Sequence, residues 1–301
     1  MELRTLRAFV EVVRQGGFSN AARTLAATQS TISKAVKQLE DELGVLLLDR
    51  LGHRTMLTPA GEVVHRRAII MLAERDDLLT ELAELRGLSR GVLRLGLPPI
   101  GSAMLFAPLL TIFRTRYPGI EIQLVEHGSK RLTEMVLAGE LELAASLLPL
   151  SDALEWQDVR RDPVDALLPS NHALATRGSL RMADLAQVPF IMFEAGFALN
   201  PILLSVCERS GFTPSVAIYT SQVDFVLGLV AAGLGVGFLP RMIAAQRGHA
   251  GVRAVPVADA GMDWHMALSW RRGGYLSQAA TAWLALVRER TSKQQEHHVR
   301  N

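Results

Sequence analysis

The sequence has a single cysteine and no long apolar run. Cys207 stands alone among 301 residues, so no intrachain disulfide can form, which fits a reducing compartment. No apolar run approaches the roughly 18 residues that a membrane-spanning helix needs, and Met1–Arg4 begins no apolar secretory segment. We therefore expect a cytoplasmic protein without a membrane partner, whose cysteine is a buried structural thiol rather than a redox switch.

The chain also lacks a large net charge. Its formal net charge is +2 at pH 7, and this small basic excess lies within residues 1–66. Such a balance neither marks nor excludes a protein that binds nucleic acid. Hydrophobic residues make up 49% of the chain, which excludes a disordered protein and, at this length, allows two domains with sizeable cores.

Motifs of the common enzyme classes are missing from the sequence. It has neither the Gly-x-Ser-x-Gly elbow of hydrolases nor a phosphate loop ending in Gly-Lys-Ser/Thr. The glycine-rich run Gly233–Gly237 lies between a predicted helix and strand, the reverse of a dinucleotide motif, and is better interpreted as a helix stop. The close histidine pair His297-His298 lies in a polar tail and is a poor zinc site. We expect no catalytic residue, metal or cofactor.

Three short helices are predicted at the amino terminus. Apolar residues recur at helical spacing over residues 3–15, and Gly16-Gly17 ends this helix. Ser19 is the expected N-cap of a second helix with a face of small residues, and Thr28 is the expected N-cap of a third. The buried stripe of the third helix is expected to comprise Ile32, Val36, Leu39 and Leu43.

The opposite face of the third helix is polar and has no acidic residue before Glu40. A recognition helix places its N-terminal residues against base edges in the major groove, where Gln can bond adenine and Lys can bond guanine or phosphate. A solvated face is the alternative, but the two short helices and the tight turn before it favour DNA binding. The candidate contacts on this helix are Thr28, Gln29, Ser30, Thr31, Ser33, Lys34 and Lys37.

A short β-hairpin is predicted after Gly44, with strands near residues 45–49 and 55–58. Arg50, His53 and Arg54 cluster near its tip, where they can reach phosphates or the minor groove. Residues 1–58 thus form a predicted winged helix-turn-helix that binds double-stranded DNA.

A long helix is expected to follow this head. Thr58 and Pro59 make a good helix start, and neither glycine nor proline interrupts residues 62–86. A helix of about 40 Å cannot bury its apolar stripe against a small head, so we favour a homodimer seam over an intrachain core, with residues 59–88 as linker helix and hinge. The stripe follows heptad spacing at Val64, Ala68, Met71, Leu78, Leu82 and Leu85.

Residues 89–301 alternate between predicted strands and helices. Strands are expected at 92–96, 120–125, 143–148, 190–193, 215–219, 236–239 and 264–269, with helices between them and at 277–290. Repeated βα units argue for a parallel, doubly wound sheet. Ligands bind beyond the carboxyl ends of strands in such sheets. The candidate ligand contacts there are Pro99, Ser102, Ser129, Phe193, Glu194, Phe197, Thr220 and Gln222, with Ser102, Ser129 and Ser221 also at expected N-cap positions.

The chain resembles the LysR-type transcriptional regulators. The resemblance is most specific in Phe18–Ala22, Thr28–Lys34, Leu39–Gly44 and Leu57–Gly61. Two departures are visible: Ser30-Thr31 stands where many members have Pro-Ala, and Leu48 where a Phe is common.

The resemblance implies a multidomain α+α/β chain: a winged helix-turn-helix, a linker helix and a periplasmic-binding-protein-like effector domain. That domain has two subdomains, one at about 91–161 and 266–295 and one at about 162–265, with crossovers near 162 and 266. Its implied function is to bind a two-fold symmetric operator and to regulate transcription under the control of a small effector molecule. Implied partners also include further copies, as a homodimer or homotetramer, and RNA polymerase. Pro98-Pro99 makes the ligand pocket more apolar than in many members. The expected effector is nonetheless a polar or anionic small molecule.

An enzyme and a solute-binding transport protein are the two rival interpretations. The missing motifs argue against the first, and the DNA-binding head and the missing secretory segment argue against the second. A gel-shift assay on the DNA upstream of the gene separates all three.

Overall fold

The computed structural model describes residues 1–49, 55–85 and 91–299, and it divides into two compact units. The first 88 residues belong to one unit, together with Leu137–Glu140 and Gly273–Tyr275, and the other residues form the second. Within the described ranges, none of the helices combines the length and the apolarity needed to cross a bilayer.

The first unit contains the predicted three-helix head and hairpin. Its elements are α1 (Leu3–Arg14), α2 (Phe18–Thr24), α3 (Gln29–Leu43), β1 (Leu48–Asp49) and β2 (Met56–Leu57), with β1 and β2 antiparallel. Apolar side chains from all three helices form one core, which includes Leu6, Phe9, Val12, Ala21, Ile32, Val36 and Leu39. The periodicity of the sequence located this core because each helix buries one face.

Two details of the head differ from the predictions. The helix α2 begins at Phe18, after Gly17, so Ser19 lies inside the helix and is not its N-cap. Phe18 packs against the core, and the helix begins two residues earlier than expected. The side chain of Leu43 is 38% exposed rather than buried, because α3 extends past the small core before Gly44 ends it in a left-handed conformation.

A set of polar contacts joins the hairpin to the helix that follows. The Thr58 hydroxyl donates to the carbonyl of Leu46 and accepts a hydrogen bond from the Gly61 amide, at 2.7 and 2.9 Å. Thr58 is therefore the N-cap that the sequence predicts. A Cβ on Gly61 would lie 2.0 Å from the Leu47 carbonyl oxygen, so only glycine allows this close approach of helix and loop.

The helix α4 (Pro59–Leu85) has 27 residues and one apolar stripe with two environments. Val64 and Ala68 pack against the core of the head. Further along, the side chains of Met71, Leu78 and Leu82 are exposed, with Leu78 at 54%. The head therefore uses only the first part of the predicted heptad stripe.

The second unit contains a seven-stranded sheet and a separate pair of strands. The strands in order are β10-β6-β11-β5-β3-β4, with β9 also paired to β6, while β7 pairs with β8. The strands are β3 (Val92–Leu97), β4 (Glu121–Glu126), β5 (Leu143–Leu147), β6 (Leu154–Pro169), β7 (Phe190–Phe193), β8 (Val216–Thr220), β9 (Gly237–Pro240), β10 (Val252–Pro256) and β11 (Asp263–Arg271). The helices are α5 (Ser102–Arg116), α6 (Ser129–Leu137), the 3₁₀ helix η1 (Met182–Leu185), α7 (Leu199–Arg209), α8 (Val223–Ala231), α9 (Arg241–Arg247) and α10 (Gln278–Val299).

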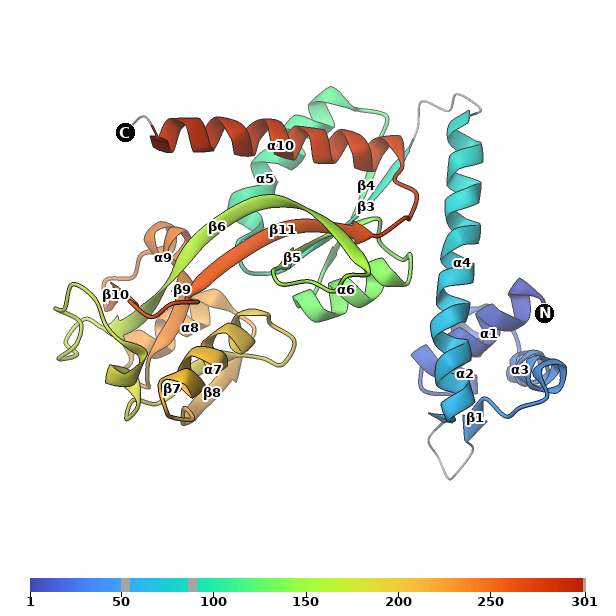
Figure 1. The fold of residues 1–301 in the computed structure, drawn as a ribbon, viewed down its shortest axis with the longest axis horizontal. Helices are drawn as coiled ribbons and strands as arrows, with labels where there is room; N and C mark the ends of the chain where they lie inside the picture. The colour runs from blue at the N-terminus through green and yellow to red at the C-terminus, as the bar shows by residue number, and fades with distance from the viewer. Residues whose placement is uncertain (50–54, 86–90, 300–301) are drawn as a thin grey trace. The chain divides into compact units, whose positions relative to one another are not determined.

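Two long strands run through this unit (Figure 1). Residues 154–163 of β6 pair with β11, whereas residues 164–169 pair with β9 and β10. The expected all-parallel sheet is wrong in this respect. The strand β3 is parallel to β4 and β5, but β6 and β11 are antiparallel to each other and β11 to β5. No strand was predicted for β6 and β10, because their apolar residues alternate with charged ones and no turn motif delimits them.

The close approach at Gly61 yields the first prediction. We expect Gly61→Ala to lower the free energy of unfolding by about 1–3 kcal/mol, because the added methyl group meets a backbone carbonyl that cannot rotate away. Urea-induced unfolding of the full chain measures this change. Gly17→Ala is the matched control, since a Cβ there has no atom within 4 Å. Equal stability of the two variants would mean that the Leu47 loop moves without cost.

Candidate nucleic-acid interface and ligand cleft

The helix α3 presents its N-terminal polar residues to solvent. Gln29, Ser30, Thr31, Lys34 and Lys37 are exposed and Ser33 is half-buried, while the opposite face is in the core. Since no carboxylate belongs to the first turn, an approaching phosphate or base edge meets amide, hydroxyl and ammonium groups only. This surface has the composition that reading of the major groove requires.

Thr28 has the capping role that the sequence predicts for it. Its hydroxyl accepts a hydrogen bond from the Thr31 amide at 3.2 Å and also contacts the hydroxyls of Ser30 and Thr31, at 2.9 and 2.8 Å. Three hydroxyl groups are thus gathered at the start of α3. The wing residues Arg50, His53 and Arg54 lie outside the described residues.

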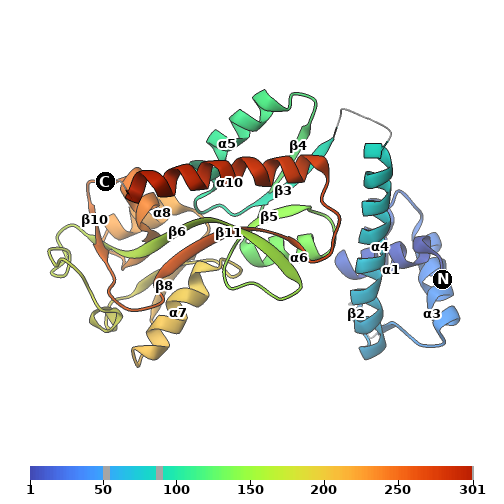
Figure 2. The same ribbon diagram turned by 45° about the horizontal axis from the view of Figure 1, so that its top comes forward.

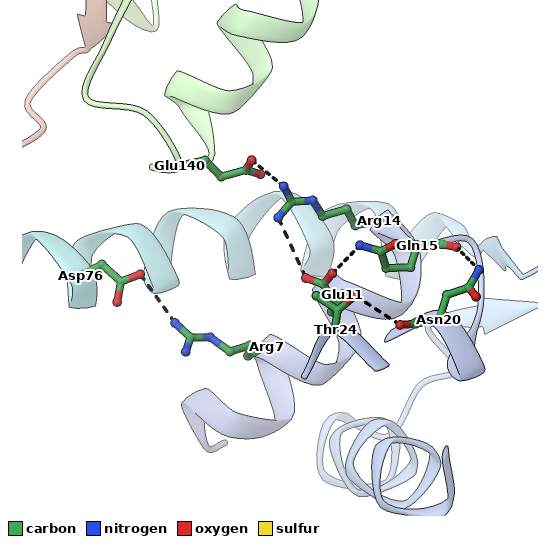
Figure 3. Close-up of polar contacts among 8 residues, drawn as sticks. All are labelled: Arg7, Glu11, Arg14, Gln15, Asn20, Thr24, Asp76 and Glu140. Atoms are coloured by element: carbon green, nitrogen blue, oxygen red, sulfur yellow. Dashed lines mark hydrogen bonds and ion pairs between the residues drawn. The ribbon is translucent and has the colours of Figure 1, made fainter. Parts of the chain in front are cut away.

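The corner between α1 and α2 is held by a polar network (Figure 3). Buried Glu11 accepts a hydrogen bond from the Gln15 side-chain amide at 2.7 Å, and the Gln15 carbonyl accepts one from Asn20 at 3.3 Å. Arg7 of α1 lies 3.6 Å from Asp76 of α4, which ties the first helix to the long one. These contacts fix the frame from which α3 projects.

Sequence reasoning missed the role of Glu40. Its carboxylate is buried and accepts hydrogen bonds from the backbone amides of Leu47 and Leu48, at 2.8 and 3.2 Å. The last buried turn of α3 therefore fixes the first strand of the hairpin. Only the tertiary structure brings these amides to the carboxylate, so the sequence carries no local signal for the contact.

The second unit has a large cavity of about 940 Å³ beside β7 and α6. Of the predicted ligand contacts, Ser129, Glu194 and Phe197 line it. Ser129 and Phe197 also border a narrow adjoining space of about 10 Å³, with Pro98 and Gly128. The two loops that carry these residues nearly touch, since a Cβ on Gly128 would lie 2.7 Å from the Gly196 carbonyl oxygen.

Five predicted ligand contacts lie outside the lining of this cavity. Phe193 is buried and stacks on Phe197 with ring centroids 5.2 Å apart. The Ser102 hydroxyl donates to the Pro98 carbonyl, and the Thr220 hydroxyl accepts from the Gln222 amide at 3.2 Å. These three support the loops around the cavity. The other two residues outside the lining are Pro99 and Gln222.

The three serines are also not the N-caps that the sequence suggests. Gly101 precedes α5 and Gln222 precedes α8, while Ser102 and Ser129 are the first residues of their helices. The left-handed backbone of Gly101, with φ 89°, turns the chain into α5 without a side-chain cap. The Ser102 hydroxyl is therefore free to bond backward to Pro98.

Other residues complete the cavity without having been predicted. Lys130, Thr133, Glu134 and Ser151 add polar groups to its wall. Asn200 is buried and bonds both backbone groups of Phe193, with distances of 2.6 Å to the carbonyl and 3.2 Å to the amide. It therefore holds the carboxyl end of β7, from which Glu194 projects. The only signal for Asn200 in the sequence is its position, as a polar residue a few places after a predicted strand.

Cys207 is fully buried in α7. Desolvation by burial raises the pKa of its thiol to about 11, so the nucleophilic thiolate is scarce at neutral pH. The thiol is thus buried, as the sequence predicts.

Comparisons with known proteins decide the family. Residues 3–62 match the model of the bacterial regulatory helix-turn-helix protein, lysR family, and residues 86–292 match the LysR substrate binding domain. The chain belongs to the LysR family. Members of this family are DNA-binding transcriptional regulators with an effector-binding domain, and not enzymes.

Individual relatives agree over most of the chain. The chain is 35% identical to the uncharacterized HTH-type transcriptional regulator YwbI of Bacillus subtilis, over 94% of this chain and 95% of that protein. It is 32% identical to a probable hydrogen peroxide-inducible genes activator of Streptomyces viridosporus, over 79% of this chain and 77% of that protein. A full-length OxyR variant from Pseudomonas aeruginosa has the same fold, with a TM-score of 0.66, 23% identity and coverage of 96% of this chain and 95% of that one.

The exposed face of α3 yields a second prediction for this LysR-family chain. We expect Gln29→Ala or Ser33→Ala to reduce discrimination between the operator and a scrambled site by about 1–3 kcal/mol, the worth of a good base contact. Lys37→Ala should weaken binding to both DNA sites alike and reduce the salt dependence of the binding constant. Fluorescence anisotropy at several salt concentrations measures both effects.

Gln38→Ala is the control for this prediction. Gln38 is an exposed glutamine of the same helix, nine residues beyond Gln29. Unchanged discrimination in both Gln29→Ala and Ser33→Ala would remove α3 as the recognition helix.

Proposed function

We propose that this chain binds a two-fold symmetric operator as a homodimer or homotetramer, and that a small polar or anionic molecule in the large cavity changes how it occupies DNA. The polar N-terminal face of α3, which has no acid in its first turn, carries the DNA-binding part of the proposal. The wing residues Arg50, His53 and Arg54 are proposed to add phosphate or minor-groove contacts. Such a regulator works in the cytoplasm and acts on RNA polymerase bound nearby.

The ligand part of the proposal rests on the wall of the cavity. Residues 89–301 are proposed as the effector domain, with subdomains at about 91–161 and 266–295 and at about 162–265. Ser129 and Lys130 come from the first subdomain and Glu194 and Phe197 from the second, and all four line the same space. A ligand that bonds Ser129 and Lys130 and packs on Phe197 would favour the closed arrangement of the two. It can shift that balance only by its differential affinity.

Peroxide sensing through the cysteine is a second candidate, suggested by the relative from Streptomyces viridosporus. Thiols that react with oxidants have a low pKa and are accessible. Cys207 has a raised pKa and no exposed surface, so its environment favours the structural role. We therefore propose regulation by a bound ligand rather than by a thiol.

The homodimer is proposed to form along the exposed part of the α4 stripe. Met71, Leu78 and Leu82 follow the heptad spacing of a coiled coil and remain exposed in the single chain. Pairing two chains there would bury these side chains and bring together two heads for two half-sites.

The third prediction tests the function. We expect the full-length protein to protect a site upstream of its own gene, and a ligand that raises its melting temperature to change the footprint. Ser129→Ala combined with Phe197→Ala should abolish this change and keep operator binding, because the head does not contain these residues. DNase I footprinting with a panel of small carboxylic and hydroxy acids measures both. The absence of any protected site would contradict the proposed regulation of the neighbouring DNA. A full change of footprint in the double variant would place the ligand outside the large cavity.

The fourth prediction tests the seam. We expect Leu78→Glu to dissociate the dimer, because it would bury carboxylates against an apolar partner. Light scattering coupled to size exclusion gives the mass. Arg66→Glu, an exposed position on the same helix, is the control and should keep the wild-type mass. A wild-type mass for Leu78→Glu as well would show that α4 is not the principal interface.

A further inference from the structure

The large cavity is lined by charged residues of opposite sign from two segments of the chain. Lys130 belongs to α6, and Glu194 directly follows β7. The loops beside them nearly touch, since a Cβ on Gly128 would lie 2.7 Å from the Gly196 carbonyl oxygen. Figures 1 and 2 show α6 and α7 on the same side of the crossing strands β6 and β11, away from α10. A positive and a negative group therefore border one space.

Both of these charges are available to a ligand. Among the residues that the structure describes, neither the Lys130 ammonium nor the Glu194 carboxylate has an ion-pair or hydrogen-bond partner. The third charged residue of the wall, Glu134, differs because it pairs with Arg131 of the same helix at 3.4 Å. A ligand that removes Lys130 and Glu194 from solvent must offer each a group of opposite charge, since a desolvated charge without a partner is costly.

The wall at the start of α6 suits a carboxylate. Ser129 is only 8% exposed, yet its hydroxyl borders the cavity and has no hydrogen-bond partner within the described ranges. A buried hydroxyl without a partner points to a ligand that supplies one. Ser129 is also the first residue of α6, where backbone amides lack intrahelical acceptors and the helix dipole favours an anion. The Lys130 ammonium adds a full positive charge beside it.

The wall at the end of β7 suits a protonated amine. The backbone of Glu194 is fixed, since its amide donates to the Thr220 carbonyl at 3.1 Å and its carbonyl accepts a hydrogen bond from Asn200 at 3.3 Å. Its carboxylate is an acceptor only, and an ammonium group has three N–H donors, so the two can form a charge-assisted pair. An acid that lacks an amine would instead meet a like charge here, which selects against it.

An aromatic surface lies between these two polar ends. The half-buried ring of Phe197 lines the cavity and stacks on buried Phe193, with centroids 5.2 Å apart and planes at 15°. Leu147 and Met192 add further apolar wall. An aromatic ring of the ligand would extend this stack, because offset-stacked rings attract each other beyond the burial of apolar surface.

We propose that the ligand of the large cavity is an aromatic α-amino acid. Its carboxylate binds Ser129 and Lys130, its ammonium group binds Glu194 and its ring stacks on Phe197. This inference rests on the proposed function, since it names the chemical class of the effector in the same cavity. The carboxylate and the ammonium group are attached to one carbon atom, so binding to both walls holds the two segments together and favours the closed arrangement.

Isothermal titration calorimetry on the full-length protein tests the ligand class with L-phenylalanine, L-tyrosine and L-tryptophan. It also uses the analogues of the tightest binder that lack the amine or the carboxylate (3-phenylpropionate and 2-phenylethylamine for L-phenylalanine). We expect saturable binding of at least one of the three amino acids. Each analogue should bind about tenfold more weakly or worse, because it loses one charge-assisted pair.

Two variants assign the two ends of the ligand. Glu194→Gln should weaken binding of the amino acid about tenfold or more and leave the acid without the amine bound at least as well as before. Lys130→Met should weaken binding of both acids and spare the amine. Each result is a ratio between two ligands on one variant, so a partly unfolded sample cannot imitate it.

Two further variants are the controls. Glu208→Gln removes an exposed carboxylate of α7 that does not line the cavity, and Lys130→Arg keeps the positive charge. Both should prefer the amino acid over its analogues as the wild type does.

Three outcomes would each overturn the proposal. They are no saturable binding of any of the three amino acids, equal affinity for the amino acid and the acid without the amine, and wild-type selectivity in Glu194→Gln. Calorimetry uses no DNA, so these outcomes leave the proposed operator binding standing. Selective binding without a protected site upstream of the gene would contradict the proposed regulation and leave the ligand class standing.

Discussion

The antiparallel pairing of β6 with β11 is the constraint on which the effector unit depends. Their register runs from Asp263 opposite Pro163 to Arg271 opposite Leu154, with one bulge between Met266 and Ala267. Backbone hydrogen bonds hold this ribbon together, so neither strand can slide by one residue without moving every side chain to the other face. Beyond residue 163 the same β6 chain continues into pairing with β9 and β10. Any rearrangement of the two parts of the unit must therefore pass through a twist or bend of this ribbon.

The position of the large cleft can be understood from that ribbon. The large cleft is built from loops at the ends of strands, where side chains are not needed for packing and can be polar. Away from the cleft, the middle of β6 carries two buried carboxylates. Buried Asp162 and Asp165 are satisfied there by the Met242 amide and by the Arg241 guanidinium, whose pKa the hydrogen bond to Asp165 raises further. These bonds tie α9 to the strand.

The sequence predicted features that depend on neighbours in the chain. The stripe of Ile32, Val36 and Leu39 and the caps at Thr28 and Thr58 are set by spacing and by hydroxyl groups within one helix turn, and all are present. The error at Leu43 arose because periodicity does not reveal where a core ends. The roles of Glu40 and Asn200 require tertiary structure, since the partners lie on different elements. The strand β6 was missed because its charged residues do not alternate regularly between water and core: Asp158 and Arg161 are exposed, whereas Asp162 and Asp165 are buried.

The environment of Cys207 has a practical consequence for experiments on this regulator. Since the thiol is fully buried and its pKa is raised, maleimide and methanethiosulfonate reagents will find little thiolate at neutral pH in the folded chain. The wild-type sequence therefore serves as a cysteine-free background without mutation. A cysteine placed at exposed Gln38, or at Phe225 on the surface of α8, accepts a fluorophore or spin label selectively. Distances between labels can then report how the two units move on DNA in the otherwise native protein.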